Sequence, residues 1–217
     1  MTLPLYPIHG TVLRTAPTVS NRGRMTNLAD GFPNSPATLT FTAGLKVVVV
    51  CCEPAGSPQA SGVTLNGVAM IEAAQTGVIN GRSASIWYLE TTASGSLVVG
   101  GSGGSGRSAL DAYEIRGYSN PNPYYTATLV NAANTSALQI DVPTSSNSIV
   151  MGSGTHGFTN PTVSASIGPA TIVTTAAYES ATGHYSWTHT PTERGPTGYN
   201  VVGSVVSGIN LAVAAWR

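Results

Sequence analysis

The sequence predicts an all-β protein, and three observations support this. Apolar and polar residues alternate with a period of two in short segments such as "ATLTF" at 37–41. About a dozen strand-like segments recur at intervals of roughly 10 to 15 residues, separated by Gly, Pro, Asn and Ser. Charged residues make up only 8% of the chain, against about 25% in a typical soluble protein, so helix-forming Lys and Glu are scarce. Together these features favour a sandwich or barrel over strand–helix units.

Proline sets the beginning of the chain apart. Five of the 14 prolines lie in residues 1–36: Pro4, Pro7, Pro17, Pro33 and Pro36. Because proline lacks an N–H and fixes φ, this density favours extended or turning backbone. We expect an extended proline-rich N-terminal arm over residues 1–36, with one short strand near Ile8–Leu13, and an antiparallel β-sandwich domain over residues 37–217. The arm either docks on a neighbouring subunit or lies along its own domain.

The first expected strands follow the arm directly. Residues 37–43 alternate apolar residues with threonine, and residues 45–53, "LKVVVVCCE", form an apolar run typical of a strand buried on both faces. Asn66 and Gly67 suit the positive-φ positions of a type I′ turn, so residues 62–74 predict a hairpin. Further strands are expected at 82–92, 94–101 and 108–118.

The second half of the chain repeats these signals. Residues 201–213 are the best helix candidate, but their glycines and β-branched residues favour a strand. Strands are expected at 124–130, 136–143, 147–154, 170–178, 183–190 and 209–216.

Composition narrows the possible partners. The formal net charge is +0, Lys46 is the only lysine, and the basic stripe that nucleic-acid binding requires is absent from the sequence. We expect no nucleic-acid partner. Apolar runs fall short of the roughly 18 residues that a membrane span needs, and the first residues do not read as a secretory signal, so no membrane partner is expected. So few charges give little protection against association, which favours a surface packed against neighbouring subunits.

The two cysteines, Cys51 and Cys52, are adjacent in a predicted strand. Neighbouring strand residues point to opposite faces, so we expect two free thiols, one in the core and one facing outward.

The glycine-rich stretch at 100–106 matches two short motifs. Residues 101–106 spell GxGxxG, and residues 100–104 spell GxSxG. Both motifs require a helix after the loop, to hold a phosphate or to present a nucleophile. The following residues, 108–118, alternate as a strand does. The stretch therefore predicts a flexible hairpin loop, and no cofactor is expected.

Other chemistry-bearing residues give weak patterns. His184 and His189 are separated by an odd number of positions, so on one strand they face opposite sides, and we expect surface or hydrogen-bonded histidines and no metal site. A hydrolase would need two facing carboxylates, and Glu90 with Asp111 or Glu114 is the first pair to consider. We expect no enzymatic activity.

The aromatic residues divide into two groups. Trp87 and Trp216 are expected in the core. The loop "GYSNPNPYY" at 117–125 instead combines prolines, asparagines and tyrosines, and we predict a contact surface there. The candidate interface residues, including the arginines of the arm, are Arg14, Arg22, Arg24, Tyr118, Pro121, Pro123, Tyr124 and Tyr125.

One run carries a resemblance to a known family. Residues 47–99, "VVVVCCEPAGSPQASGVTLNGVAMIEAAQT…RSASIWYLETTASGSLVV", and the closing "GINLAVAAWR" resemble a β-sandwich family common in bacteriophage and phage-like genomes. The match covers about residues 38–217, and the arm lies outside it. The resemblance implies a jelly-roll-like two-sheet fold and a structural role in the virion, with no catalytic residues to carry over.

These observations converge on one functional expectation. The chain is expected to be a non-enzymatic structural protein on the surface of a tailed bacteriophage particle, as a capsid decoration or cement protein or a head fibre. Its expected partners are the major capsid protein or other virion proteins and further copies of itself. The alternative is a carbohydrate- or receptor-binding module of a tail fibre, with a host glycan as ligand and exposed aromatics from among Tyr124, Tyr125, Tyr185 and Trp187.

Overall fold

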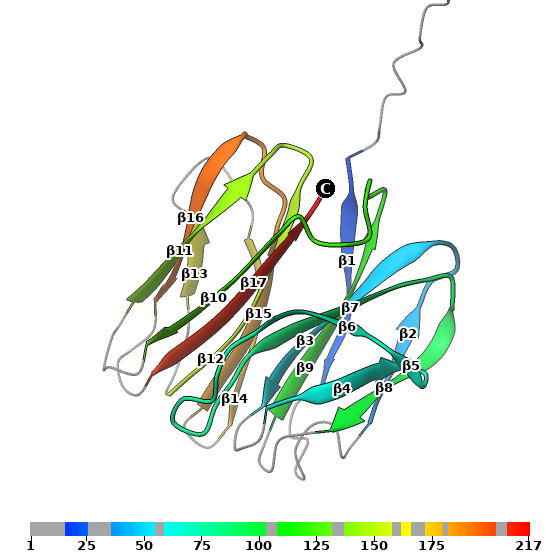
Figure 1. The fold of residues 1–217 in the computed structure, drawn as a ribbon, viewed down its shortest axis with the longest axis horizontal. Coiled ribbons are helices and arrows are strands. Elements are labelled where there is room, and N and C mark those ends of the chain that lie inside the picture. Colours follow the sequence, from blue (N-terminus) through cyan, green and yellow to red (C-terminus); the bar gives the residue numbers. More distant parts are fainter. Residues whose placement is uncertain are drawn as a thin grey trace, which may run out of the picture.

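The fold was determined as a computed structural model. It describes residues 16–25, 36–54, 59–102, 108–131, 137–157, 162–165, 172–179, 182–202 and 208–217. Seventeen strands in these ranges form four sheets, and all the strand pairs are antiparallel (Figure 1). The all-β prediction is confirmed, but the described strands form four sheets where two were expected. No helix in the described ranges is long and apolar enough to cross a membrane.

The N-terminal half of the chain, residues 18–116, builds two of the sheets. The N-terminal inner sheet has the order β1 (Thr18–Met25), β9 (Ser108–Arg116), β3 (Lys46–Pro54), β7 (Ser85–Thr91), β6 (Ile71–Gln75). The N-terminal outer sheet has the order β2 (Ala37–Phe41), β8 (Gly95–Ser102), β4 (Ser61–Leu65), β5 (Val68–Ala69).

The C-terminal half, residues 125–216, builds the other two. The C-terminal inner sheet has the order β10 (Tyr125–Asn131), β17 (Ile209–Trp216), β12 (Ile149–Gly157), β15 (Thr182–His189), β14 (Ile172–Glu179). The C-terminal outer sheet has the order β11 (Ala137–Thr144), β16 (Gly195–Val202), β13 (Thr162–Ala165).

The two halves follow the same strand order. If β5 and β6 count as one strand that changes sheet at Met70, each half has eight strands in the described ranges. When the strands are numbered from the start of each half, both inner sheets have the order first, eighth, third, sixth, fifth strand. Both outer sheets begin with the second, seventh and fourth strands. One short sequence match accompanies this order: "GSLVVG" at 95–100 corresponds to "GYNVVG" at 198–203. The chain is therefore a tandem of two units with one topology.

The four sheets stack as layers with a hydrophobic core in each gap. Side chains of β2, β4 and β8 meet one face of β3 and β9, around Phe41 and Trp87. The opposite face of β3 and β9 meets β12 and β17, around Tyr113 and Trp216. The far face of β12, β15 and β17 meets β11 and β16, around Trp187. The order is thus outer, inner, inner, outer, as Figure 1 shows from right to left.

The stacking explains why the central strands are buried throughout. Every residue of β3, β12 and β17 is buried, because their sheets are covered on both faces. Cys52 faces the core of the N-terminal half, and Cys51 faces the core between the halves. Both thiols are free and buried. The expectation that one would face outward is therefore wrong, since a second sheet covers that side.

The hairpin predicted at 62–74 is confirmed as far as Ala69, whereas residues 71–75 form β6, which pairs with β7 in the inner sheet. β4 pairs with β5 through Leu65 and Val68, and the two turn residues have positive φ, 51° at Asn66 and 81° at Gly67. These angles are those of a type I′ turn.

The glycine-rich stretch does not form the expected hairpin. β8 pairs with β2 and β4, whereas β9 pairs with β1 and β3, so the chain changes sheets between Ser102 and Ser108. Residues 103–107 lie outside the described residues. A strand, and no helix, follows at 108–116, as the alternation predicted.

Part of the predicted arm belongs to the sheet. Residues 18–25 form β1, which pairs with β9 along the edge of the N-terminal inner sheet. Pro17 comes just before this strand, where a proline is tolerated. The strand near Ile8–Leu13 and the rest of residues 1–15 lie outside the described residues.

Glycines on β12 make room for aromatic rings on β15. Gly152 pairs with Trp187 and Gly154 with Tyr185, and a Cβ at either glycine would lie within 2.4 Å of the opposite ring. Trp187 also stacks on Tyr199 of β16, with ring centroids 4.5 Å apart. The rings therefore lie across the glycine backbone and fill the core of the C-terminal half.

Candidate functional site

Charged residues meet in the buried gap between the two halves. Arg24 of β1 lies between Glu53 of β3 and Asp111 of β9, and both carboxylate side chains are 0% exposed. The Arg24 Nη2 donates to Glu53 Oε2 at 2.9 Å, and Nη1 donates to Asp111 Oδ2. We call these three residues, with their hydroxyl partners Ser153, Ser186 and Tyr113, the interhalf polar cluster.

A β-bulge in β1 brings Arg24 into this cluster. Asn21 pairs with Tyr113 and Gly23 with Ala112, so Arg22 is an extra residue on the β1 side. On a regular strand Arg22 and Arg24 would share a face. Instead Arg22 reaches Glu114 at 2.8 Å, on the side of the outer sheet, while Arg24 pairs with Asp111 on the side of the other half.

The cluster joins the two halves through hydrogen bonds. Ser186 of β15 donates to Asp111 Oδ2 at 2.7 Å and is also bonded to the Tyr113 hydroxyl. The main-chain oxygen of His184 accepts from Arg24 at 2.9 Å. Ser153 of β12 adds a longer contact of 3.4 Å to Glu53. Removing Arg24 would leave both carboxylates buried without a counter-charge.

Burial perturbs the acidic groups of the cluster. Loss of hydration raises the pKa of Glu53 to about 8, against the opposing effect of the Arg24 guanidinium. The same cause raises the pKa of Asp111 to about 6. Two carboxylates share one cation, so a proton on one of them makes the cluster neutral. We conclude that the cluster retains a proton near neutral pH, chiefly on Glu53.

The carboxylate pair considered for a hydrolase is not formed. Glu90 accepts a hydrogen bond from Tyr118 at 2.7 Å, and Glu114 is held by Arg22 and by the Thr42 hydroxyl. Asp111 and Glu114 point to opposite faces of the sheet. The carboxylates that the structure does bring together, Glu53 and Asp111, are buried, so they do not line a cleft.

The histidines of β15 face opposite sides, as their spacing predicted. His189 bonds to the Tyr199 hydroxyl at 2.6 Å, on the side of the outer sheet. His184 lies on the other side, next to Arg24, and burial together with that positive charge lowers its pKa to about 4. Among the described residues, no group of three His, Cys, Asp or Glu side chains is arranged to hold a metal ion.

The predicted contact loop at 117–125 turns out to connect the halves. Its backbone and side chains are tied to both: Trp216 Nε1 donates to Pro121 O at 2.9 Å, and Tyr88 donates to the Asn122 side chain at 2.9 Å. Tyr124 and Tyr125 donate to main-chain oxygens of β11. Tyr118 and Pro123 are half-buried. The loop is a packed linker, and an additional contact with a partner stays a prediction.

The arginines predicted for the interface have different fates. Arg14 lies outside the described residues. Arg24 is 10% exposed and belongs to the interhalf polar cluster, so it does not offer a docking surface. Arg22 is 23% exposed and paired with Glu114. Arg22 and Arg24 were assigned to the arm because neither the strand at 18–25 nor its bulge has a clear sequence signal.

One hollow opens at the end of the molecule where the linker meets the last residue. It has a volume of about 480 Å³ and is lined by Tyr124, Pro143, Thr144, Ser145, Arg194 and Arg217. We call it the rim hollow. Among the residues that line it, only Tyr124 belongs to the predicted interface. Arg194 and Arg217 were missed, because nothing local in the sequence places them together.

The aromatic rim expected for a glycan-binding module is only partly available. Tyr185 and Trp187 are fully buried. Trp216 is also fully buried, and Trp87 is nearly so. The core positions of Trp87 and Trp216 are therefore confirmed, and two of the four aromatics named for a glycan site are excluded from it. Tyr124 and Tyr125 remain half-buried at the surface.

Comparison with known proteins yields no match to a family model, and no curated protein or solved structure is significantly similar to this chain.

Proposed function

We propose that this chain is a non-enzymatic structural protein of a tailed bacteriophage particle, as a capsid decoration or cement protein or a head fibre that docks on the capsid lattice. Under this proposal each half is a jelly roll, a fold of two facing sheets that recurs in viral capsid and lectin domains. The observation that carries the proposal is the strand order found in both halves. Two interlocked Greek keys produce an inner sheet of first, eighth, third and sixth strands over an outer sheet of second, seventh and fourth strands, and here β6 and β14 extend the two inner sheets.

A second feature supports docking on another protein. The N-terminal outer sheet, made of β2, β8, β4 and β5, contains no Asp, Glu, Lys or Arg. Its outward side chains include Thr38, Thr40 and Val98, all exposed. Free protein surfaces normally intersperse charges of both signs, so an uncharged sheet face is suited to being covered.

The buried charges support a scaffold role as well. The interhalf polar cluster ties β1, β3 and β9 to β12 and β15 with directional bonds. Such bonds hold the two halves in one relative position, which a subunit of a regular shell requires.

Incorporation into particles tests the proposal. Cryo-electron microscopy of intact particles is expected to show the chain on the capsid, with the N-terminal outer sheet against its neighbour. Val98→Glu should reduce the amount of protein per particle at least several-fold without lowering Tm. Val202→Glu, which places the same charge at an exposed valine of β16 in the C-terminal outer sheet, is the matched control and should leave incorporation unchanged. Particles that lack the chain would refute the proposal, and full incorporation of Val98→Glu would refute the assignment of the docking face.

A further inference from the structure

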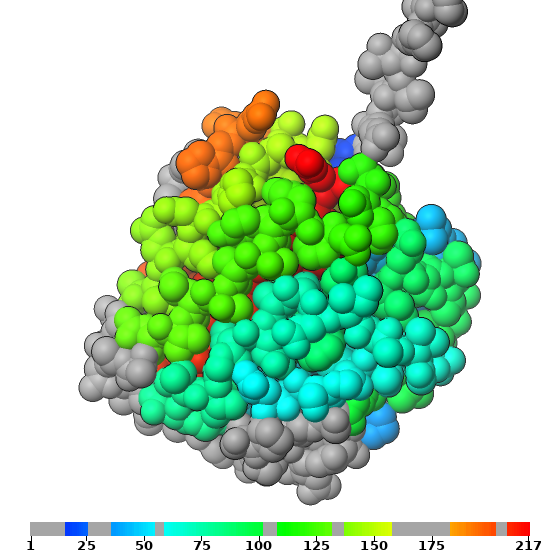
Figure 2. Space-filling model, in the orientation of Figure 1, coloured from blue at the N-terminus to red at the C-terminus, as the bar shows by residue number. Residues whose placement is uncertain are grey.

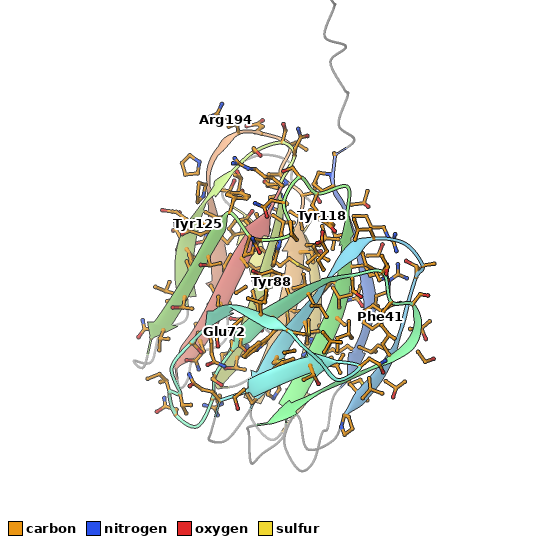
Figure 3. All side chains as sticks on the ribbon, turned by 45° about the vertical axis from the view of Figure 1, so that its right-hand side comes forward. Phe41, Glu72, Tyr88, Tyr118, Tyr125 and Arg194 are labelled. Atoms are coloured by element: carbon orange, nitrogen blue, oxygen red, sulfur yellow. The ribbon has the colours of Figure 1, made fainter. Side chains whose placement is uncertain are left out.

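The rim hollow combines positive charge with a flat apolar wall. Arg194 lies in the turn between β15 and β16, and Arg217 follows β17. Both side chains are exposed, and within the described residues neither guanidinium has a carboxylate partner. Figure 3 shows Arg194 projecting from the upper edge of the molecule, away from the sheets. The two cations therefore have unused hydrogen-bond donors.

The other walls of the hollow are fixed in place. The Tyr124 hydroxyl donates to Pro143 O at 2.8 Å, and the Arg217 guanidinium lies 5.1 Å from the centre of the Tyr124 ring. The main-chain oxygen of Arg217 accepts from the Ser119 N–H at 2.8 Å and from its hydroxyl at 2.7 Å. In Figure 2 the C-terminal residues, in red, lie at the surface beside the green and yellow-green segments that carry these walls.

The free hydrogen-bonding groups of the hollow are mainly donors, so they favour a ligand that accepts hydrogen bonds. Thr144 Oγ1 is already bonded to Gly195 O at 2.7 Å and to Thr197, so it offers little to a ligand. Within the described part of the chain, the groups of the hollow that are free to bind a ligand are the two guanidiniums and the Ser145 hydroxyl, and no Asp or Glu lines the hollow. A carboxylate fits this set best, because a guanidinium binds it through two parallel N–H···O bonds.

From these features we propose that the rim hollow binds a carboxylate-bearing sugar residue of the uronic acid type. The arginines receive the carboxylate, Ser145 bonds a ring hydroxyl, and the apolar surface of Pro143 and the Tyr124 ring edge supports the sugar ring. The volume of about 480 Å³ lies within the range of about 300–1,000 Å³ found for small-molecule sites. This inference does not depend on the proposed virion role, since a carbohydrate-binding surface would serve a protein in any particle or in none.

Calorimetric titration of the full chain with D-glucuronate tests the proposal, with D-glucose and sodium acetate as comparison ligands. We expect saturable binding of glucuronate, at least tenfold weaker binding of acetate, and no binding of glucose. Arg194→Gln and Arg217→Gln should each weaken glucuronate about tenfold, the loss expected for a charge-assisted pair. Arg194→Lys should recover only part of this loss, because an ammonium cannot bind a carboxylate in the bidentate way.

Glu72→Gln is the control variant. Glu72 is exposed on β6 and is well separated from Arg194 in Figure 3, so its replacement changes the net charge by one unit without touching the site. Its affinity for glucuronate should equal that of the wild type. Four results would overturn the proposal: no binding of glucuronate, equal affinity for glucuronate and acetate, equal affinity for glucuronate and glucose, or full binding by both glutamine variants with unchanged Tm.

Discussion

Replacement of Gly152 by alanine tests the packing of the C-terminal half. A Cβ at this position would lie 2.1 Å from Trp187 Cε2 and Nε1, whereas ordinary contact begins near 3.4 Å. Trp187 is fully buried and stacked on Tyr199, which is also fully buried, so the indole has no free space to move into. The backbone of β12 and β15 must therefore separate, or the ring must leave its rotamer.

The magnitude follows from the cost of overpacking. Inserting a methyl group into a filled core costs about 1–3 kcal/mol, and the short contact at Gly152 places this substitution at the upper end, about 3 kcal/mol. For a chain of this size about 1 kcal/mol shifts Tm by about 2–4 °C, so Gly152→Ala should lower Tm by roughly 6–12 °C. Differential scanning calorimetry measures this shift.

A control and a double mutant separate this clash from a general effect of losing a glycine. Gly77 is exposed and a Cβ there would have no neighbour within 4 Å, so Gly77→Ala should change Tm by less than about 2 °C. In a Trp187→Leu background, Gly152→Ala should cost at least about 1 kcal/mol less than it does alone, because the obstructing indole is gone. A wild-type Tm for Gly152→Ala, or a purely additive cycle, would refute the packing described for β12 and β15.

Three further perturbations test other parts of the structure. Because burial raises the pKa of Glu53 to about 8 from an ordinary value of 4.5, the folded state binds a proton that the unfolded chain has released. Stability from this group is thus present at low pH and is lost as pH rises toward 8. Urea denaturation measures this loss, with Glu53→Gln as the reference because the buried histidines contribute equally to both proteins. Between pH 6.5 and 8 the wild type should lose about 2 kcal/mol of unfolding free energy relative to the variant. Parallel pH curves for the two proteins would contradict this. Lys46, the only lysine, is 0% exposed, and its Nζ donates to the main-chain oxygens of Thr42 and Ala93. An amine-reactive ester should therefore modify this side chain only after unfolding, as mass spectrometry of the peptide that contains Lys46 would reveal. Deletion of residues 2–15 retains β1, whereas deletion of residues 2–30 removes β1 together with Arg24. The longer deletion should lower the free energy of unfolding by at least about 3–5 kcal/mol or abolish folding. If the circular dichroism melts of both truncations coincide, Arg24 does not hold the buried carboxylates.

Several elements of this structure follow from local sequence. The period-two alternation at 37–41 reappears as the alternating burial of β2, and the Asn66–Gly67 pair forms the expected turn. The apolar run at 45–53 lies in β3, which is buried on both faces. These features depend on the geometry of one strand or one turn, which a short segment encodes by itself.

Other features depend on contacts between distant segments. Local sequence did not predict β13 or β16. β1 was assigned to the arm because "NRGRM" has no apolar alternation. Its arginines are instead held by carboxylates 87 and 92 residues away. The candidate sites were the least predictable part. Arg24, Glu53 and Asp111 come from three different strands, and the rim hollow joins a linker, the end of β11, two turns and the last residue.

By itself, the sequence determined that this protein is built of antiparallel strands, where most of them lie, and which side chains alternate between core and surface. Tertiary structure alone decided that the strands form four layers in two units of the same order, and that Arg22 and Arg24 point to opposite sides of one sheet. The physical reason is that alternation specifies which residues are buried but not which sheet buries them. Pairing partners are chosen by long-range complementarity, such as Gly152 beneath Trp187, that no single segment contains.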